Sequence, residues 1–549
     1  MTEVLAAAQA WLAIDPDPQS RTELSTLISA AQAGAAPAIR ELEDSFATRL
    51  AFGTAGIRGA LGPGPNRMNR VVVQQTAAGL ARYLLAHGGG SVVIGHDARH
   101  RSADFAHDVA AVLSQSGLSA MVLPRALPTP LLAFAIRWLG CAAGVMVTAS
   151  HNPARDNGIK VYLGDGSQIV PPADAEISAE IDRVAASKEL PSAQIDSEWL
   201  TLDEQVIDAY IETAVALVSH STARSVRAVY TAMHGVGGEL FERVFERAGF
   251  PSVIAVPEQL QPDPDFPTVA FPNPEEPGAM DLALALAQTQ RVDLIIASDP
   301  DADRCAIGIP DATTLGWRML SGDEVGWLLG WWVLERGNRG TLVQSLVSGS
   351  MLKAIAERAG VEYRQTLTGF KWISRVPDLA FGYEEALGYC VDPAHVRDKD
   401  GITAALLFAE LAAILKAEGR TVQDLLDQLA LQHGVYATAQ VSVRLADPTL
   451  ITNAMQALRQ HPPTSVGGLA VQAVDDLELP SDGLPPTDGL RFTLEGGGRV
   501  IVRPSGTEPK VKCYLQVIEP VQGSDVGAAR TAAQAALARI ADDARQWLG

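Results

Sequence analysis

Residues 92–123, "VVIGHDARHRSADFAHDVAAVLSQSGLSAMVL", form the stretch that decides the fold expected for this chain. Short apolar runs stand at both ends, and apolar side chains recur at helical spacing between them, which predicts strand, loop, helix and strand. A length of about 30 residues is that of one parallel crossover unit. Gly117 follows the helical part, where a left-handed residue ends a helix at least cost.

Two further segments repeat this pattern. They are residues 226–256, "VRAVYTAMHGVGGELFERVFERAGFPSVIAV", and residues 341–369, "TLVQSLVSGSMLKAIAERAGVEYRQTLTG", with Gly249 and Gly360 after the helices. Three such units in separate regions predict three α/β domains of related topology. A single large doubly wound sheet is the alternative.

The character of the chain changes beyond about residue 436. "GVYATAQVSVRL", "LRFTLEGGGRVIVRPSG" and "VKCYLQVIEP" are typical of strands, and the alanine-rich residues 525–548 are typical of a closing helix. This order predicts an α+β domain. The fold expected is therefore three α/β domains with mixed sheets, at 1–203, 204–316 and 317–435, followed by an α+β domain at 436–549.

The charge of the chain excludes some classes of partner. Its 43 Lys and Arg residues against 64 Asp and Glu residues give a net charge of −21, which repels nucleic acid and acidic membrane surfaces. An anionic ligand must therefore be held by locally concentrated Arg and Lys. We expect a monomer or weak homodimer that binds a small molecule.

Cysteine usage and apolar runs indicate the compartment. The cysteines lie far apart without a CxxC pair, which disfavours a zinc knuckle and a disulfide framework; they are Cys141, Cys305, Cys390 and Cys513. No basic residue precedes Arg21, and the longest apolar run, residues 325–334, is too short to span a bilayer. We interpret the protein as cytoplasmic.

The loop "SDPDADR", residues 298–304, follows the apolar strand "VDLIIA". Asp299, Asp301 and Asp303 can aim three carboxylates at one point, where their repulsion calls for a cation. Oxygen ligands without His or Cys favour Mg²⁺ over zinc. An EF-hand would need Gly and Glu where Arg304 and Pro310 stand. An acidic surface turn is the alternative.

Ser150 ends another apolar strand, in "VMVTASHNPARDNGIKVY", residues 145–162. The G-x-S-x-G elbow of serine hydrolases is absent, because Thr148 and Asn152 flank the serine. A phosphate on Ser150 would add about −1.5 to −2 charge and complete the coordination of Mg²⁺. His151 and Lys160 would then act as proton carrier and counter-charge. An Asn-Pro turn with a capping serine is the alternative.

Two glycine-containing stretches are candidates for phosphate contacts. "FGTAGIRG", residues 52–59, presents Arg58 among glycines, although a structural glycine turn is as good an interpretation. "VRPSGTEPKVK", residues 502–512, clusters hydroxyls, a glycine and cations, which suits a phosphate dianion better than a simple polar turn between strands; its candidate residues are Arg503, Ser505, Gly506, Thr507 and Lys510.

A third stretch is a candidate for sugar binding. "LTGFKW" supplies Lys371, and "GYEEALGY", residues 382–389, supplies Glu384 and Glu385. Carboxylates on a loop suit vicinal sugar hydroxyls. Adjacent Glu residues that are merely solvated are the alternative.

Taken together, the motifs resemble the α-D-phosphohexomutase superfamily over nearly the whole chain. "GTAGIRG", "TASHNP", "DPDADR", "GYEEALGY" and "RPSGTEPKVK" occur in that family's order. The opening "WLAIDPDPQSR" and "GYEEALGY" resemble the branch with phosphoglucomutases, phosphopentomutases and glucose 1,6-bisphosphate synthase, many bacterial members of which are labelled phosphomannomutase. The resemblance implies four domains around a central cleft.

The resemblance also implies roles for particular residues. Ser150 would be the phosphoserine and a metal ligand together with Asp299, Asp301 and Asp303. Arg58, His151, Lys160 and Arg304 would surround the transferred phosphoryl group. Glu384 would contact sugar hydroxyls, and the non-reacting phosphate would be held by Arg503, Ser505, Gly506 and Thr507.

The reaction implied is an intramolecular phosphoryl transfer between the 1- and 6-positions of a hexose phosphate, with Mg²⁺ as cofactor and a sugar 1,6-bisphosphate as intermediate and activator. Glucose phosphates are the leading substrates; mannose or pentose phosphates, and bisphosphate synthesis, are alternatives. Many hexomutases have Ser where this chain has Ala386, which leaves the sugar open. A non-catalytic phosphosugar-binding protein is a further alternative.

Overall fold

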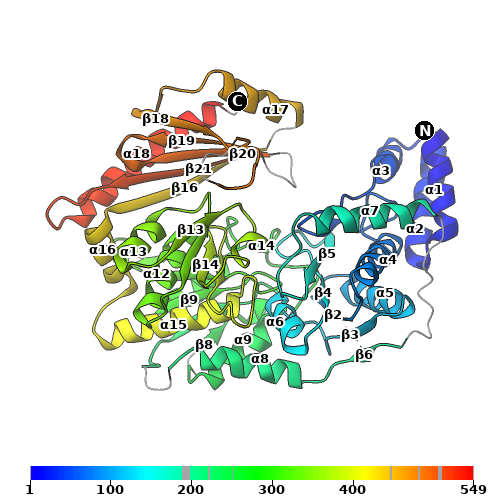
Figure 1. The fold of residues 1–549 in the computed structure, drawn as a ribbon, viewed down its shortest axis with the longest axis horizontal. Helices are drawn as coiled ribbons and strands as arrows, with labels where there is room; N and C mark the ends of the chain where they lie inside the picture. The colour runs from blue at the N-terminus through cyan, green and yellow to red at the C-terminus, as the bar shows by residue number, and fades with distance from the viewer. Residues whose placement is uncertain are drawn as a thin grey trace. The chain divides into compact units, whose positions relative to one another are not determined.

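The computed structural model describes residues 2–187, 198–219, 223–250, 253–444, 448–479, 483–504 and 510–547. The chain divides into two compact units (Figure 1). The first unit comprises residues 1–319 and 388–413, and the second comprises residues 320–387 and 414–549.

The first unit begins with three helices, α1 (Thr2–Ile14), α2 (Pro18–Gln32) and α3 (Ala36–Ala47). Asp17 caps α2 by accepting the Gln19 N–H, and Pro18 occupies the first turn, where no hydrogen bond is lost. Trp11 and Phe46 meet edge to face. None of the described helices is long and apolar enough to cross a membrane.

A mixed sheet follows, and in the described residues its strand order is β1-β5-β4-β2-β3-β6. Strands β2, β3, β4 and β6 are parallel, whereas β5 is antiparallel to both β1 and β4. The strands are β1 (Ile57–Ala60), β2 (Ser91–His96), β3 (Ser119–Val122), β4 (Ala143–Val147), β5 (Asp156–Leu163) and β6 (Leu200–Thr201).

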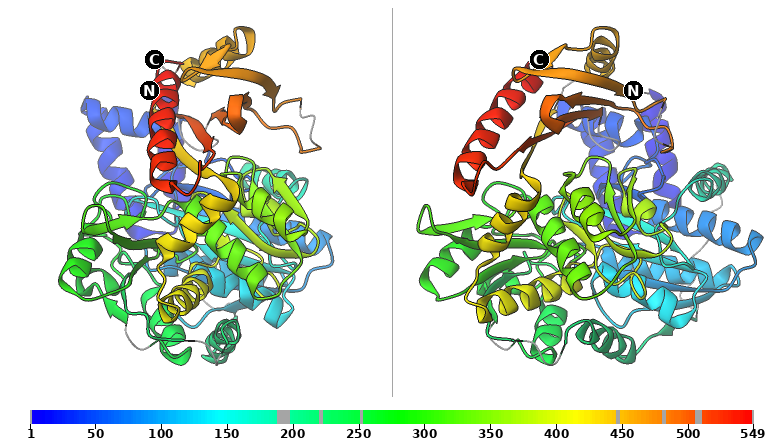
Figure 2. Two further views of the ribbon diagram at one scale, coloured as in Figure 1. Left: turned by 90° about the vertical axis from the view of Figure 1, so that its left-hand side faces the viewer. Right: turned by 60° about the vertical axis from the view of Figure 1, so that its left-hand side comes forward.

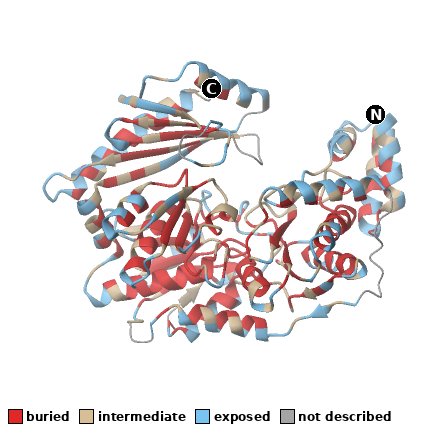
Figure 3. Ribbon diagram, in the orientation of Figure 1, coloured by how far each residue is buried: buried red, intermediate tan, exposed pale blue. Residues whose placement is uncertain are grey.

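Helices cover both faces of this sheet. Val92 and Ile94 belong to a core shared with α4 (Arg70–Ala86), α5 (Ser102–Gln115) and α7 (Ala173–Ala186). On the opposite face, Ile136 of α6 (Thr129–Leu139) packs beside Gly144 and Val93. Figure 3 shows the resulting buried layers.

The second sheet of this unit has the order β11-β10-β9-β7-β8 in the described residues. Strands β7, β8 and β9 are parallel, and β10 and β11 are added antiparallel. The strands are β7 (Ala228–Thr231), β8 (Val253–Ala255), β9 (Leu294–Ala297), β10 (Ala306–Asp311) and β11 (Gly316–Met319), with helices α8 (Gln205–Ala216), α9 (Gly238–Arg247), α10 (Pro257–Leu260) and α11 (Asp281–Thr289). The unit also includes β15 (Gly388–Cys390) and most of α15 (Gly401–Ala417).

The described strands of the second unit belong to two separate sheets. Parallel strands β12 (Thr341–Ser345), β13 (Tyr363–Thr366) and β14 (Leu379–Glu384) pack with helices α12 (Gly322–Glu335), α13 (Met351–Ala359), α14 (Phe370–Ile373) and α16 (Val422–His433). Ser321 and Glu324 form a capping box at the start of α12.

The last sheet is antiparallel and, among the described residues, has the order β16-β21-β20-β19-β18-β17. The strands are β16 (Val435–Arg444), β17 (Ser465–Val466), β18 (Leu469–Asp476), β19 (Leu490–Leu494), β20 (Arg499–Pro504) and β21 (Lys510–Glu519). The closing helix α18 (Val526–Trp547) lies along β16 and β21 (Figure 2), and α17 (Pro448–Gln460) lies between β16 and β17 in the sequence.

The predicted fold class is confirmed. The three repeated segments form β2-α5-β3, β7-α9-β8 and β12-α13-β13, each with its two strands parallel and adjacent. Gly117 and Gly249 have φ of 91° and 83°, the left-handed conformation expected after a helix. The alternative of one large doubly wound sheet is wrong. The domain boundaries at 203, 316 and 435 stay a prediction.

Candidate active site

Ser150 lies just beyond the buried strand β4 and is itself buried. Its φ of 53° is in the left-handed region, which costs a residue with a Cβ atom about 1 kcal/mol or more. The Ser150 Oγ donates a hydrogen bond to Asp299 Oδ2 at 2.9 Å and lies 3.2 Å from His151 Nδ1. The interpretation of Ser150 as a mere turn cap is wrong, because this hydroxyl contacts the Asp loop.

The three aspartates of the loop after β9 are completely buried. Asp299, Asp301 and Asp303 are each at most 1% exposed, and one oxygen from each lies within 4.8 Å of the others. Asp301 Oδ1 and Asp303 Oδ1 accept no hydrogen bond from any described residue. The alternative of an acidic surface turn is wrong, and the oxygen-only donor set suits a hard divalent cation such as Mg²⁺.

Cations face the aspartates from other elements. The Nζ atom of Lys160, on β5, lies 2.6 Å from Asp301 Oδ2 and 2.8 Å from Asp303 Oδ2. The side chain of Lys160 is only 2% exposed. Arg304 lies 4.0 Å from both Asp299 and Asp303, and its backbone N–H donates to Asp299 Oδ1 at 3.1 Å. The positive charges of Lys160 and Arg304 thus offset the negative charge of the loop inside the protein.

The pKa values of Asp299 and Asp301 are shifted in opposite directions. Burial raises the pKa of Asp299 well above its usual value, and its neighbours Asp301 and Asp303 raise it further. Burial acts in the same direction on Asp301, but the charge and hydrogen bond of Lys160 outweigh it and hold that pKa far below its usual value. The two carboxylates in turn keep the pKa of Lys160 raised despite burial.

The electrostatics of His151 are of the opposite kind. Burial, and then the charges of Arg304 and Arg58, hold the pKa of His151 well below its usual value. The imidazole is therefore held in its neutral form near neutral pH.

The glycines around Arg58 have a structural function. Gly56 has φ of 77°, and a Cβ atom there would lie 1.8 Å from Ile159 O. Gly53 and Gly56 also exchange backbone hydrogen bonds at 3.0 and 2.8 Å. The turn leads Arg58 into β1, where it pairs with Gly158 of β5, and a contact of Arg58 with phosphate stays a prediction.

Thr129 and Lys399 are neighbours of the aspartates that our sequence analysis missed. Thr129 Oγ1 donates to Asp301 Oδ2 at 2.5 Å, and Lys399 Nζ lies 3.2 Å from Asp303 Oδ2. Lys399 belongs to "RDKDG", residues 397–401, and a Cβ atom at Gly401 would lie 2.2 Å from Arg304 O. A lysine between two aspartates before a glycine was the available signal.

The second unit contains the residues predicted to bind the sugar and the second phosphate. Glu384 Oε1 accepts the Gly369 N–H at 2.6 Å. Glu385 Oε2 accepts the hydroxyls of Ser345 and Ser348 at 3.1 and 2.9 Å. The alternative of freely solvated glutamates is wrong, because both are partly buried and hydrogen-bonded.

Arg503 and Lys371, predicted to bind the substrate, lie on β20 and α14 of the second unit. Arg503, on β20, donates to Thr368 Oγ1, and its Nε is buried without a hydrogen-bond partner among the described residues. Lys371 lies in α14, two residues after Gly369, and Lys510 begins β21. Ser505, Gly506 and Thr507 lie outside the described residues.

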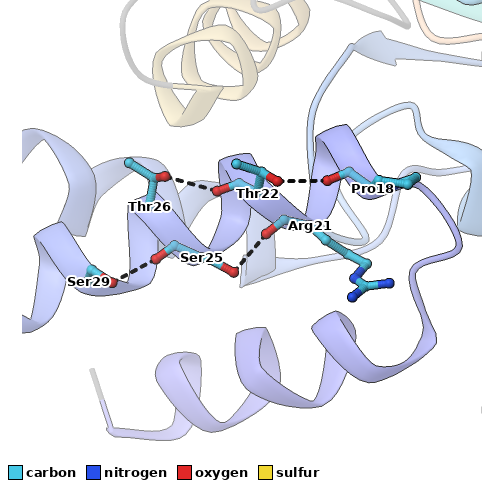
Figure 4. Close-up of a pocket in the computed structure, with 6 residues that line it drawn as sticks. All are labelled: Pro18, Arg21, Thr22, Ser25, Thr26 and Ser29. Carbon is cyan, nitrogen blue, oxygen red and sulfur yellow. Dashed lines mark hydrogen bonds between the residues drawn. The ribbon is translucent and has the colours of Figure 1, made fainter.

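A hollow also lies on α2, away from these residues in the sequence (Figure 4). Its hydroxyls donate to backbone carbonyls four residues earlier, so they are already satisfied within the helix. It is lined by Pro18, Arg21, Thr22, Ser25, Thr26 and Ser29.

Four sequence models of one family match the chain in order. They are described as phosphoglucomutase/phosphomannomutase, alpha/beta/alpha domains I, II and III and C-terminal domain, and they match residues 49–188, 208–312, 321–432 and 384–532. The chain belongs to the phosphoglucomutase/phosphomannomutase family. This family member is therefore an enzyme, an isomerase-type phosphotransferase, and the resemblance inferred from the motifs is confirmed.

Individual relatives of this family member carry different names. It is 48% identical to the Haemophilus influenzae "Probable phosphomannomutase", with 82% of this chain and 92% of that protein covered. It is 36% identical to a phosphoglucomutase of Staphylococcus haemolyticus, with 86% and 91% covered, and 35% identical to the human phosphopentomutase, with 88% and 87% covered.

Solved structures agree with the fold. A phosphoglucomutase/phosphomannomutase family protein from Burkholderia thailandensis superposes with a TM-score of 0.68 at 21% identity, covering 91% of this chain and 96% of that one.

Proposed function

We propose that this protein is a Mg²⁺-dependent phosphosugar mutase that moves a phosphoryl group between the 1- and 6-positions of a hexose phosphate, with glucose 1-phosphate and glucose 6-phosphate as the leading pair. The observation that carries the proposal is the hydrogen bond of 2.9 Å from Ser150 Oγ to Asp299, one of three buried aspartates. A serine that merely ended a strand would not need buried carboxylates beside its hydroxyl.

Asp299, Asp301, Asp303 and an oxygen of phosphorylated Ser150 would hold the metal. Asp301 Oδ1 and Asp303 Oδ1, which accept no hydrogen bond from a described residue, support this assignment. A bound Mg²⁺ would neutralise negative charge on the transferred phosphoryl group. Arg58, Lys160 and Arg304 would add positive charge around the same group, so catalysis would come mainly from positioning and charge.

The transfer step needs one proton to move. The hydroxyl oxygen of a sugar monophosphate bonds to the phosphorus of phospho-Ser150, the bond from phosphorus to Oγ breaks, the hydroxyl proton passes to a base, and Oγ takes up a proton as it leaves. His151 is our candidate for the group that exchanges a proton with Oγ, because its Nδ1 lies 3.2 Å from Oγ whereas Lys160 is occupied by two carboxylates. The bisphosphate then turns over and returns its other phosphate to Ser150.

The second unit would supply recognition of the rest of the substrate. Glu384 and Glu385 are assigned to sugar hydroxyls, because one oxygen of each is held by the protein and so fixes the loop. Lys371 and Arg503 would bind phosphate together with Ser505, Gly506 and Thr507. A sugar 1,6-bisphosphate would act as activator by phosphorylating Ser150.

The sugar is the least constrained part of this proposal. Relatives named phosphopentomutase cover most of the chain at 35% identity, and they support ribose 1-phosphate as a second candidate substrate. The 48% identical relative named "Probable phosphomannomutase" supports mannose 1-phosphate as a further candidate substrate.

Initial rates test the proposal. The protein is assayed with Mg²⁺ and a trace of glucose 1,6-bisphosphate on glucose 1-phosphate, mannose 1-phosphate and ribose 1-phosphate, beside Ser150→Ala. We expect the wild type to turn over at least one of these sugar phosphates and Ser150→Ala to turn over none. The relative rates of the wild type then rank the sugars. Equal turnover by Ser150→Ala would overturn the phosphoserine, and net accumulation of bisphosphate from 1,3-bisphosphoglycerate would indicate a synthase instead.

A further inference from the structure

The backbone after Ser150 is held by one buried side chain from another strand end. Arg99 follows β2 and donates from its two terminal nitrogens to four carbonyl oxygens: Ser150 O at 2.6 Å, Asn152 O at 2.5 Å, Pro153 O at 2.8 Å and Asp156 O at 3.2 Å. These acceptors span the whole turn between β4 and β5. Arg99 is only 4% exposed.

Arg99 is itself fixed from several sides. Its Nε lies 3.4 Å from Asp97 Oδ2, and its guanidinium lies 4.9 Å from the centre of the Phe266 ring. Asp97 Oδ1 accepts the Arg99 N–H at 3.0 Å and the Ser102 hydroxyl at 2.6 Å. A planar, charged fork with both sides occupied has one orientation available to it.

We propose that Arg99 is a positioning residue for the phosphoryl transfer: by binding the carbonyls of residues 150–156 it holds Ser150 in its left-handed conformation and so places Oγ beside Asp299. The inference deepens the proposed function and rests on it. Among the described residues Arg99 has no hydrogen bond to the Asp loop, and in this assignment it acts through the backbone of the serine loop.

The strain at Ser150 explains why these contacts matter, and we call Arg99 with its four carbonyl contacts the clamp. A serine with φ of 53° leaves the left-handed region unless surrounding contacts hold it there. Release of the carbonyls would let the turn relax and move Oγ away from Asp299. A displacement of about 1 Å at a reacting atom costs about 100-fold in rate. Lysine cannot replace the fork, because a single ammonium group cannot reach four carbonyls in different directions.

Arg99→Lys tests the inference, with Arg70→Lys as matched control. Arg70 makes a similar two-pronged contact in the same unit, with Asp108 at 2.7 and 2.6 Å, but has no contact with the serine loop. Each protein is phosphorylated with labelled glucose 1,6-bisphosphate, and transfer of the label to the best sugar monophosphate is followed by rapid quenching. KM and the melting temperature are measured in parallel.

We expect Arg99→Lys to lower the transfer rate by about 100-fold while KM changes less than about threefold. Arg70→Lys is expected to lower the melting temperature less, because its side chain is 31% exposed, and to keep the transfer rate within about threefold of the wild type. A merely structural role for Arg99 would lower only the melting temperature. A transfer rate for folded Arg99→Lys equal to that of Arg70→Lys would overturn the inference.

Asp97→Asn keeps the inference testable where Arg99→Lys does not fold. The amide oxygen still accepts the Ser102 hydroxyl and the Arg99 N–H, but the charged contact to Nε is lost, so a decrease in transfer rate of about tenfold is expected. An unchanged rate would overturn the inference. A wild-type protein that takes no label on Ser150 would overturn the proposed function, and with it the clamp, whereas labelled wild type with unaffected variants overturns the clamp alone.

Discussion

The serine–aspartate site of the first unit and the glutamate loops of the second unit hold their carboxylates in opposite ways. In the first, three buried aspartates face Lys160, Lys399 and Arg304. In the second, Glu384 and Glu385 are held by a backbone N–H and two serine hydroxyls.

This difference follows from what each region must do. Asp301, whose charge is matched by Lys160, stays ionised and fixed, and such a charge suits a site where charge develops during a reaction. Burial raises the pKa of Glu385, which is held by neutral donors, and a carboxylate held in this way can exchange a protein partner for a sugar hydroxyl. The first region is therefore expected to control rate, and the second to control affinity and choice of sugar.

Neutralising one aspartate should break the first region most severely. Asp301→Asn keeps the shape but leaves Lys160 without half of its counter-charge and removes an expected metal ligand. We expect kcat to fall by about 10³-fold or more. Steady-state rates measure it, with Asp104→Asn, an exposed aspartate on α5, as control. Turnover of Asp301→Asn within about tenfold of wild type would contradict the assignment.

Removing a more distant cation should have a smaller effect. Lys399 lies 3.2 Å from Asp303 and contacts the triad at one carboxylate, whereas Lys160 contacts two. Lys399→Met is expected to lower kcat by about 10- to 100-fold. Lys353→Met, which removes an exposed lysine of α13, serves as control. An effect of Lys399→Met no greater than that of the control would show that Lys399 is structural.

The second region should make the free energy of unfolding depend on pH. Burial raises the pKa of Glu385 from 4.5 to about 7, and the charges of Glu384 and Asp323 add to the effect. The native state therefore keeps a proton that the unfolded chain releases near pH 4.5. The resulting stabilisation is complete below pH 4.5 and is lost as the pH rises to about 7.

Glu385→Gln should remove this dependence, because the amide stays neutral. Partial exposure reduces the expected difference in the free energy of unfolding to roughly 2 kcal/mol between pH 5 and pH 8. Calorimetry across that range compares the two proteins, and Glu357→Gln, at an exposed glutamate of α13, is the control. Parallel pH profiles for wild type and Glu385→Gln would contradict the raised pKa.

The sequence predicted the parts of this molecule that depend on local pattern. Strand, helix and glycine recur within about 30 residues in each α/β segment, so the three crossover units could be recognised. The Asp loop and Ser150 could be recognised too, because each directly follows an apolar strand. These two loops could also be expected to share one site, because a phosphate on Ser150 would complete the coordination of Mg²⁺, and the resemblance to a family implied the same arrangement.

Other neighbours of the site could not be predicted from pattern. Thr129 and Lys399 reach the aspartates from segments about 170 and 100 residues away, and the single residues carry no periodic signal. Arg99 acts on backbone carbonyls, which are the same whatever the sequence of the loop. The glutamate partners Ser345 and Ser348 depend on how β12 and β14 pair, which pattern alone does not fix.

The smallest change is expected at Ala386, where the second region's choice of sugar can be sharpened. The loop backbone beside it is fixed, because a Cβ atom at Gly322 would lie 1.8 Å from Glu385 O and Leu387 has φ of 64°. A serine at 386 would therefore present its hydroxyl from a defined position. We expect Ala386→Ser to raise kcat/KM for glucose 1-phosphate relative to ribose 1-phosphate by roughly three- to tenfold.

Competition between the two sugar phosphates measures this ratio directly, and Ala394→Ser, at an exposed position of the first unit, controls for an added hydroxyl elsewhere. A change in kcat of both substrates by the same factor would place residue 386 among the groups that control rate. That result would contradict the division of labour between the two regions, because a side chain of the glutamate loop would then act on the transfer step and not on the choice of sugar.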